Sequence, residues 1–106
     1  MAALVVIGPG DPGDPGWVEA RSVAGIAELA RAGHTVVVTP AALVGSAAGH
    51  AGHAEEAAEL AVAAVCVWAG ARVLRTTRPG PVRQAAEMAD ALAGRRPPAL
   101  TRRGLA

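Results

Sequence analysis

Arginine and threonine side chains follow an apolar run in the stretch VLRTTRPGPVRQ, residues 73–84. Arg75 ends that run, and Thr77 and Arg78 come just before a proline-rich turn that leads into a helical pattern. A guanidinium can hold a phosphate with two parallel hydrogen bonds, and the junction between a strand and the next helix often holds anions. We therefore predict an anion-binding site at Arg75, Thr77 and Arg78. The spacing equally allows Arg75 to pair with a carboxylate or to reach solvent.

The segment GPGDPG, residues 8–13, has the glycine spacing of a dinucleotide-binding loop and follows another apolar run. Pro9 and Pro12 remove two of the backbone amide donors that such a loop needs. No acidic residue stands at the end of the next apolar run to bind a ribose. We therefore interpret the segment as a turn-rich loop.

Two further groups of residues have chemistry that a site can use. His50 and His53 stand near Glu55 and Glu56, but they lack further ligands at a fixed spacing. Cys66 is the chain's single cysteine and lies among alanine and valine residues, which is typical of a small buried hydrophobe. We expect no catalytic residue, no cofactor and no metal site.

Composition and charge limit the class of protein. The chain has 106 residues, 52% of them hydrophobic, which suits one folded domain. Its ten basic residues are all arginine, they are mostly scattered, and the formal net charge is +1. A nucleic-acid partner is therefore not expected. The first apolar run, ALVVI, is too short to cross a bilayer, so we predict a cytoplasmic protein without a membrane partner.

Apolar runs alternate with helical patterns along the chain, which indicates an α/β fold with a parallel sheet. Each predicted strand is rich in β-branched residues, and each predicted helix has apolar residues at helical spacing. The predicted strands are 3–7, 34–39 and 71–76, and the predicted helices are 17–32, 54–69 and 81–93. These three βα units form one predicted domain, residues 1–94, and residues 95–106 form an extended C-terminal tail.

The last of these units, from AGARVLRTTRPGPVRQ onward, resembles the C-terminal end of dihydropteroate synthase. The resemblance is strongest over residues 61–106, and the segments GHTVVVTPAALVG and ALVVIGPG are similar to the two preceding units of that family. The family is a (β/α)8 TIM barrel that condenses a pterin pyrophosphate with p-aminobenzoate in folate biosynthesis. The resemblance implies that this chain holds the last three βα units of the barrel, without the first five.

The polar positions of that family are mostly replaced in this chain. Residues 8–10 are Gly-Pro-Gly where the family has Asp-Pro-Gly, and residues 39–41 are Thr-Pro-Ala where it has Ser-Arg-Lys. The family's Arg-x-His becomes Arg75 followed by two threonines, of which Thr77 takes the place of the histidine. The resemblance thus implies a pseudoenzyme, not catalytic by itself, that acts as an interaction or ligand-binding module linked to folate-type metabolism.

A fragment of a barrel raises a physical problem. Three parallel strands with helices on one side would leave alternate residues of the former barrel interior exposed, together with two strand edges. We therefore expect a homo-oligomer, or a protein partner that covers the open sheet face, with an interface on the order of 2,000 Å². A pterin or another phosphate-bearing small molecule is a further expected ligand.

Two alternatives stay open at this point. The chain can be a subunit of a split dihydropteroate synthase-like enzyme, in which Arg75 contributes to a pterin-pyrophosphate site and a partner supplies the catalytic groups. Alternatively, VVIGPGDPGDPG is similar to the glycine-rich opening of tetrapyrrole methyltransferases, which implies a fragment that binds S-adenosylmethionine.

Overall fold

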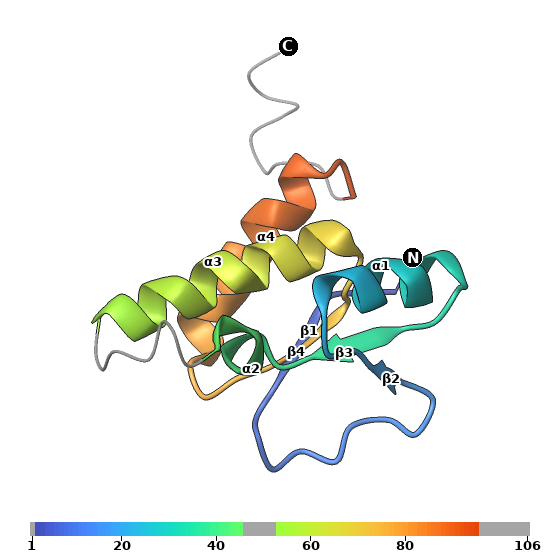
Figure 1. Cartoon of the computed structure of the whole chain (residues 1–106), viewed down its shortest axis with the longest axis horizontal. Helices are drawn as coiled ribbons and strands as arrows, with labels where there is room; N and C mark the ends of the chain where they lie inside the picture. Colours follow the sequence, from blue (N-terminus) through green and yellow to red (C-terminus); the bar gives the residue numbers. More distant parts are fainter. Residues whose placement is uncertain (1, 46–52, 96–106) are drawn as a thin grey trace.

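The computed structural model describes residues 2–45 and 53–95 (Figure 1). In this part of the chain, four parallel strands form one sheet and four helices flank it. The elements in chain order are β1 (Val5–Ile7), β2 (Val18–Glu19), α1 (Val23–Arg31), β3 (Val36–Val38), α2 (Pro40–Val44), α3 (His53–Ala69), β4 (Val73–Arg75) and α4 (Pro79–Leu92). The predicted α/β class with a parallel sheet is confirmed.

The first predicted unit differs from the structure. Residues Val18–Glu19 form the short strand β2, although the sequence pattern predicted a helix from Trp17 onward. Val18 pairs with Val36 of β3, so the extended conformation there is held by a neighbouring strand and not by local preference. The helix α1 starts later, because the Ser22 hydroxyl caps it by accepting a hydrogen bond from the Gly25 amide at 3.0 Å.

Two other boundaries also differ from the predictions. The predicted second strand, residues 34–39, is β3, and Pro40 directly after it begins the short helix α2, in a stretch for which no helix was predicted. Proline suits the first turn of a helix because its missing amide has no partner there in any case. For the same reason α4 begins at Pro79, two residues before its predicted start at Pro81. None of the described helices is long and apolar enough to span a membrane.

The order of strands across the sheet is β1-β4-β3-β2. β1 lies beside β4, with Val5 opposite Val73 and Ile7 opposite Arg75. The connection from β1 to β2 contains no helix and leads from one edge of the sheet to the other. In a barrel, strands that follow one another in the chain lie side by side. The first two strands of this sheet are instead its two edges.

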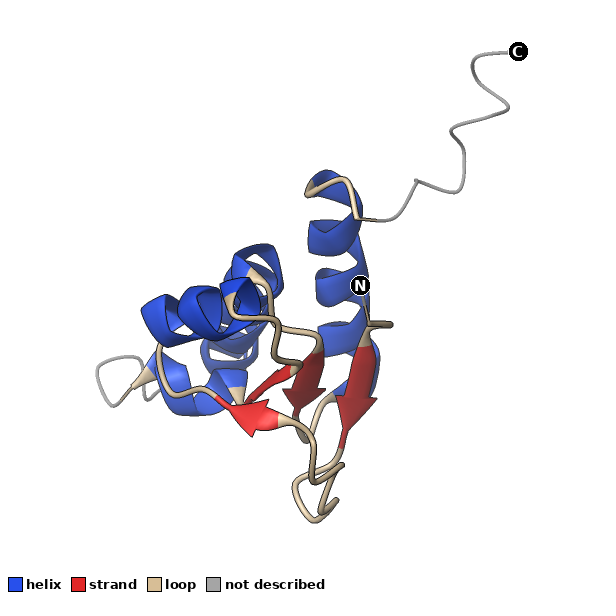
Figure 2. Cartoon of the chain, turned by 90° about the vertical axis from the view of Figure 1, so that its right-hand side faces the viewer, coloured by secondary structure: helices blue, strands red, loops and turns tan. Residues whose placement is uncertain are grey.

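The main core lies between the sheet and the helices, which gather on one side of the sheet (Figures 1 and 2). Val36, Val38 and Leu74 point to this side and are fully buried. Ile26 of α1 and Val67 of α3 pack against the same cluster. The strands supply alternate residues to this core because successive side chains in a strand point to opposite faces.

The opposite face of the sheet has a smaller core of its own. Ile7, Val37 and Val73 lie there, and Val5 and Trp17 pack against them. The loop between β1 and β2 runs along this side in Figure 1 and brings Trp17 to it. Val37 is 4% exposed and Val73 only 1%. The expectation that these alternate strand residues would be exposed is therefore wrong, because an aromatic side chain from the chain's own loop covers them.

Candidate functional site

Arg75 ends β4 and is bound to other parts of the same chain. Its Nη1 donates a hydrogen bond to Glu19 Oε1 on β2 at 3.1 Å, and its Nη2 lies 3.5 Å from the backbone oxygen of Asp11. The Arg75 side chain is 20% exposed. The structure thus shows the carboxylate-paired arrangement, one of the two alternatives that the sequence left open.

Arg78 precedes α4 and binds carboxylates of α3. Its Nη1 donates to Glu59 Oε1 at 2.7 Å, and its Nη2 donates to Glu55 Oε1 at 3.3 Å. The hydrogen bond to Glu59, followed by the one to Glu55, raises the pKa of Arg78 above its usual value. Both described arginines of the predicted anion site therefore have carboxylate partners, on different elements.

Glu59 is the centre of this polar cluster and was not singled out from the sequence. The residue is 1% exposed, and its Oε2 accepts a 2.6 Å hydrogen bond from the Thr76 hydroxyl. The Thr76 oxygen in turn accepts a hydrogen bond from the Arg78 backbone amide at 2.9 Å. Glu59 lies four residues before Ala63, which is also buried. This helical spacing could have placed Glu59 on the buried face of α3.

Thr77 and Arg78 line a small cavity of about 230 Å³, whose wall does not include Arg75. Glu55 and Glu59 line the same cavity. An anion in this space would meet two carboxylates, which disfavour a second negative charge. The structure thus brings Thr77 and Arg78 together and directs the Arg75 side chain elsewhere.

The loop that resembles a dinucleotide-binding loop is held by its own aspartates. The Asp11 carboxylate accepts a hydrogen bond from the Gly13 amide at 2.8 Å, and that of Asp14 accepts one from the Gly16 amide at 2.7 Å. Such local bonds are typical of aspartate turns. The first of these bonds uses an amide within residues 8–13 that a phosphate would need, in agreement with the interpretation of this segment as a turn-rich loop.

The remaining candidates from the sequence are His50, His53 and Cys66. His50 lies outside the described residues, and within the described ranges no three metal-binding side chains gather as a group. Cys66 is fully buried in the main core. Burial raises the pKa of its thiol to about 11, so the thiol stays protonated at neutral pH.

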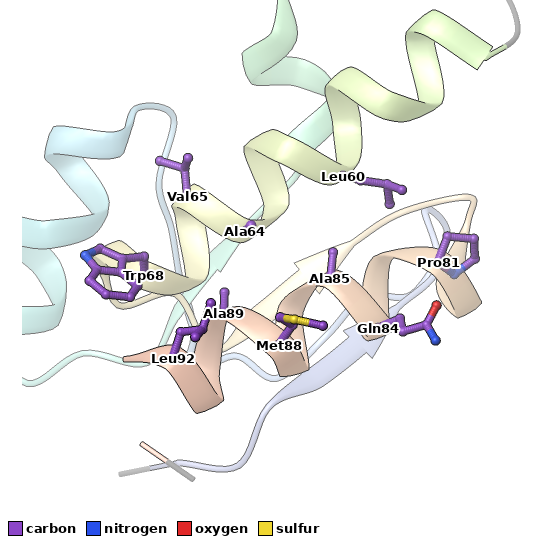
Figure 3. A pocket seen from close by; sticks show the side chains of 10 residues that line it. All are labelled: Leu60, Ala64, Val65, Trp68, Pro81, Gln84, Ala85, Met88, Ala89 and Leu92. Carbon is purple, nitrogen blue, oxygen red and sulfur yellow. The ribbon is translucent and has the colours of Figure 1, made fainter. Parts of the chain in front are cut away.

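An exposed apolar groove of about 570 Å³ lies between α3 and α4 (Figure 3). We call it the α3–α4 groove. Four large side chains along it are half exposed or more: Val65 at 50%, Trp68 at 57%, Met88 at 63% and Leu92 at 72%. The full lining is Leu60, Ala64, Val65 and Trp68 of α3 with Pro81, Gln84, Ala85, Met88, Ala89 and Leu92 of α4.

The orientation of α4 corrects a prediction. The apolar residues at helical spacing in the predicted helix 81–93 are Val82, Ala85, Met88, Ala89 and Leu92, and this spacing predicts that all of them face the core. Val82 is buried, but Met88 and Leu92 are exposed. The buried stripe of α4 also includes Asp90, which is 2% exposed and forms an ion pair with Arg72. Because a charged residue occupies the inner face, the helix presents Met88 and Leu92 outward.

Comparisons with known proteins give no relative. No protein-family model matches the chain, and neither the curated proteins nor the solved structures contain a match to it.

Proposed function

We propose that this protein is a non-catalytic interaction module whose binding surface is the α3–α4 groove. The observation that carries the proposal is the exposure of Val65, Trp68, Met88 and Leu92 along a single groove. A contiguous exposed apolar patch on a small protein marks a place where another molecule binds. Tryptophan and methionine are also enriched at the centres of protein interfaces.

The chemistry of the groove favours a protein over a small polar substrate. Its ten lining residues include no charged side chain, and Gln84 is the one polar member. A site for a small polar molecule normally has several polar groups that fix its orientation. An uncharged groove between two helices instead suits an apolar helical surface of another protein.

The polar residues support the same proposal. Arg75 and Arg78 each bind carboxylates of the same chain, and the buried Cys66 thiol is protonated at neutral pH. A nucleophile or general base needs a reactive protonation state and access to a substrate. The pterin-phosphate site implied by the resemblance to dihydropteroate synthase stays a prediction. A phosphate that binds Arg75 would have to displace Glu19 from it.

Site-specific photo-crosslinking tests the proposed binding surface. A photoreactive residue replaces Met88 in the full chain, and the control replaces Glu28, which is exposed on α1 and does not line the groove. The proposal expects one defined cross-linked protein from position 88 and none from position 28. Purified chain should then bind that protein with a saturable isotherm, which Met88→Glu abolishes.

Two outcomes count against the proposal. Equal cross-linking from both positions would show that contact at the groove is non-specific. An absence of any cross-linked protein from position 88, a second copy of the chain included, would show that the groove is not a binding surface.

A further inference from the structure

We propose that the occupant of the α3–α4 groove is a second copy of this chain, bound about a two-fold axis. This inference rests on the proposed function, because it names the partner of the same surface. Its basis is the distribution of large and small side chains, the charge of the groove and its exposed area.

The groove has large side chains at both of its ends. Figure 3 shows Trp68 and Leu92 near one end and Leu60 and Pro81 near the other, with Met88 between them. A two-fold axis over the middle of the groove places each end of the groove in one copy against the opposite end of the groove in the partner copy. Trp68 and Leu92 of one copy then contact Leu60 and Pro81 of the other, and the two Met88 side chains approach each other near the axis. Such an interface is self-complementary.

Small residues provide the space that the large side chains need. Ala64, Ala85 and Ala89 line the groove between the helices and are less exposed than Met88 and Leu92. Large side chains that insert between small ones are the usual basis of close helix packing. Under the two-fold arrangement these alanines leave room near the axis for the Met88 side chain of the partner copy.

The lack of charge in the groove is compatible with a second copy. No charged side chain lines it, so two identical grooves can face each other without repulsion. Beside the groove on α4, Arg83 and Glu87 have opposite charges and lie 3.9 Å apart. This pair leaves the rim without net charge at that place. Homodimer interfaces are more apolar than those between different proteins.

The exposed area agrees with an interface of ordinary size. Val65, Trp68, Met88 and Leu92 are each half exposed or more. An aromatic side chain such as that of Trp68 has about 150–250 Å² of surface to bury, and the aliphatic ones are somewhat smaller. Two copies together would therefore bury on the order of 800 Å² from these residues. A standard interface buries about 1,600 Å² in total, of which somewhat more than half is apolar. The polar rim would supply the rest.

Sedimentation equilibrium of the full chain at micromolar concentration tests this inference. The proposal expects twice the chain mass of 10.5 kDa for the native sequence. Met88→Glu and Leu92→Glu should each give a single chain mass, because each buries a carboxylate in an apolar interface. The matched control is Val23→Glu, which places the same charge on a 40%-exposed valine outside the groove and should leave the mass doubled.

Circular dichroism of each variant shows whether it is folded, and a mixing experiment tests the two-fold arrangement. Met88→Glu and Met88→Arg should each be monomeric and should form a mixed dimer when combined, because the two positions meet near the axis. Failure of the mixture to dimerise would overturn the two-fold arrangement.

The outcomes separate this inference from the proposed function. A monomeric native chain, or a dimer that survives Met88→Glu, overturns self-association through the groove. If the native chain is monomeric while position 88 cross-links to a different protein, the interaction module stands and the second copy fails. If the native chain is monomeric and position 88 cross-links to no protein, both proposals fail.

Discussion

Arg72 and Asp90 form a buried ion pair with two hydrogen bonds. Arg72 Nη1 donates to Asp90 Oδ1 at 2.7 Å, and Nη2 donates to Oδ2 at 3.1 Å. The Nε of Arg72 donates to the backbone oxygen of Ala2 at 3.0 Å. The pair links the residue before β4 to the inner face of α4, and so it helps to determine which face of α4 lies outward. The exposure of Met88 and Leu92 depends on this orientation.

Removal of the Asp90 carboxylate should destabilise the protein strongly. Asp90→Ala leaves the Arg72 guanidinium buried without its carboxylate, and we expect the free energy of unfolding to fall by about 3–5 kcal/mol. Arg83→Ala is the matched control, because its ion pair with Glu87 is exposed, and its effect should stay below about 1 kcal/mol. Urea unfolding measures both values. Similar losses in the two variants would show that the buried pair has no special role.

Gly70 allows α3 and α1 to approach each other closely. Its φ is +126°, and an added Cβ would lie 2.6 Å from the Ala30 Cβ. Gly70→Ala should therefore destabilise the protein by on the order of 3 kcal/mol, from backbone strain and overpacking together. Gly80→Ala in α4 meets no atom within 4 Å and should instead stabilise slightly. Thermal unfolding of the two variants should show shifts of opposite sign.

Burial of Cys66 predicts a loss of stability at alkaline pH. The folded state holds the pKa of the thiol at about 11, above its ordinary value of 9.0. Between these values the unfolded chain loses the thiol proton and the folded chain keeps it, so this contribution to stability is complete below pH 9.0 and falls as pH rises toward 11. Urea unfolding over this pH range should show a steeper decline for the native chain than for Cys66→Ala. Parallel declines would contradict the assignment.

Phosphate binding tests the role that the sequence suggested for Arg75. Since Arg75 is bound to Glu19, we expect no saturable heat when inorganic phosphate is titrated into the native chain at low ionic strength. The hypothesis of a dihydropteroate synthase-like anion site predicts the opposite result. A saturable signal that Arg75→Ala removes and Arg31→Ala leaves intact would establish that site and would count against our interpretation of the ion pair.

The sequence predicts those elements whose signals are local. The β-branched runs around Val36–Val38 and Val73–Arg75 are strands, and the stretch that Gly70 ends is the helix α3. β2 was missed because it has two residues and is extended only through its pairing with β3. The strand order could not be predicted either, because apolar runs of similar composition do not specify which of them pair.

The α3–α4 groove could not be predicted from the sequence for a related reason. Apolar spacing alone treats every large hydrophobic residue of a helix as a core residue, so Met88 and Leu92 were placed inside. Their true direction depends on Asp90, whose burial requires a partner from a distant part of the chain, Arg72. The alternate strand residues were likewise predicted to be exposed. Trp17 packs against the cluster that contains Val37 and Val73, and the position of its loop is a tertiary feature that the sequence pattern does not show.

The most direct test of the central claim is the accessibility of Trp68 as a function of concentration. The chain has two tryptophans, and Trp17→Phe leaves Trp68 as the single fluorophore while it keeps an aromatic ring in the smaller core. If two copies pair through the α3–α4 groove, acrylamide should quench Trp68 weakly at high protein concentration and more strongly on dilution, with the same midpoint as the change in mass. Strong quenching that does not vary with concentration would show that Trp68 faces solvent in every state and would contradict the account.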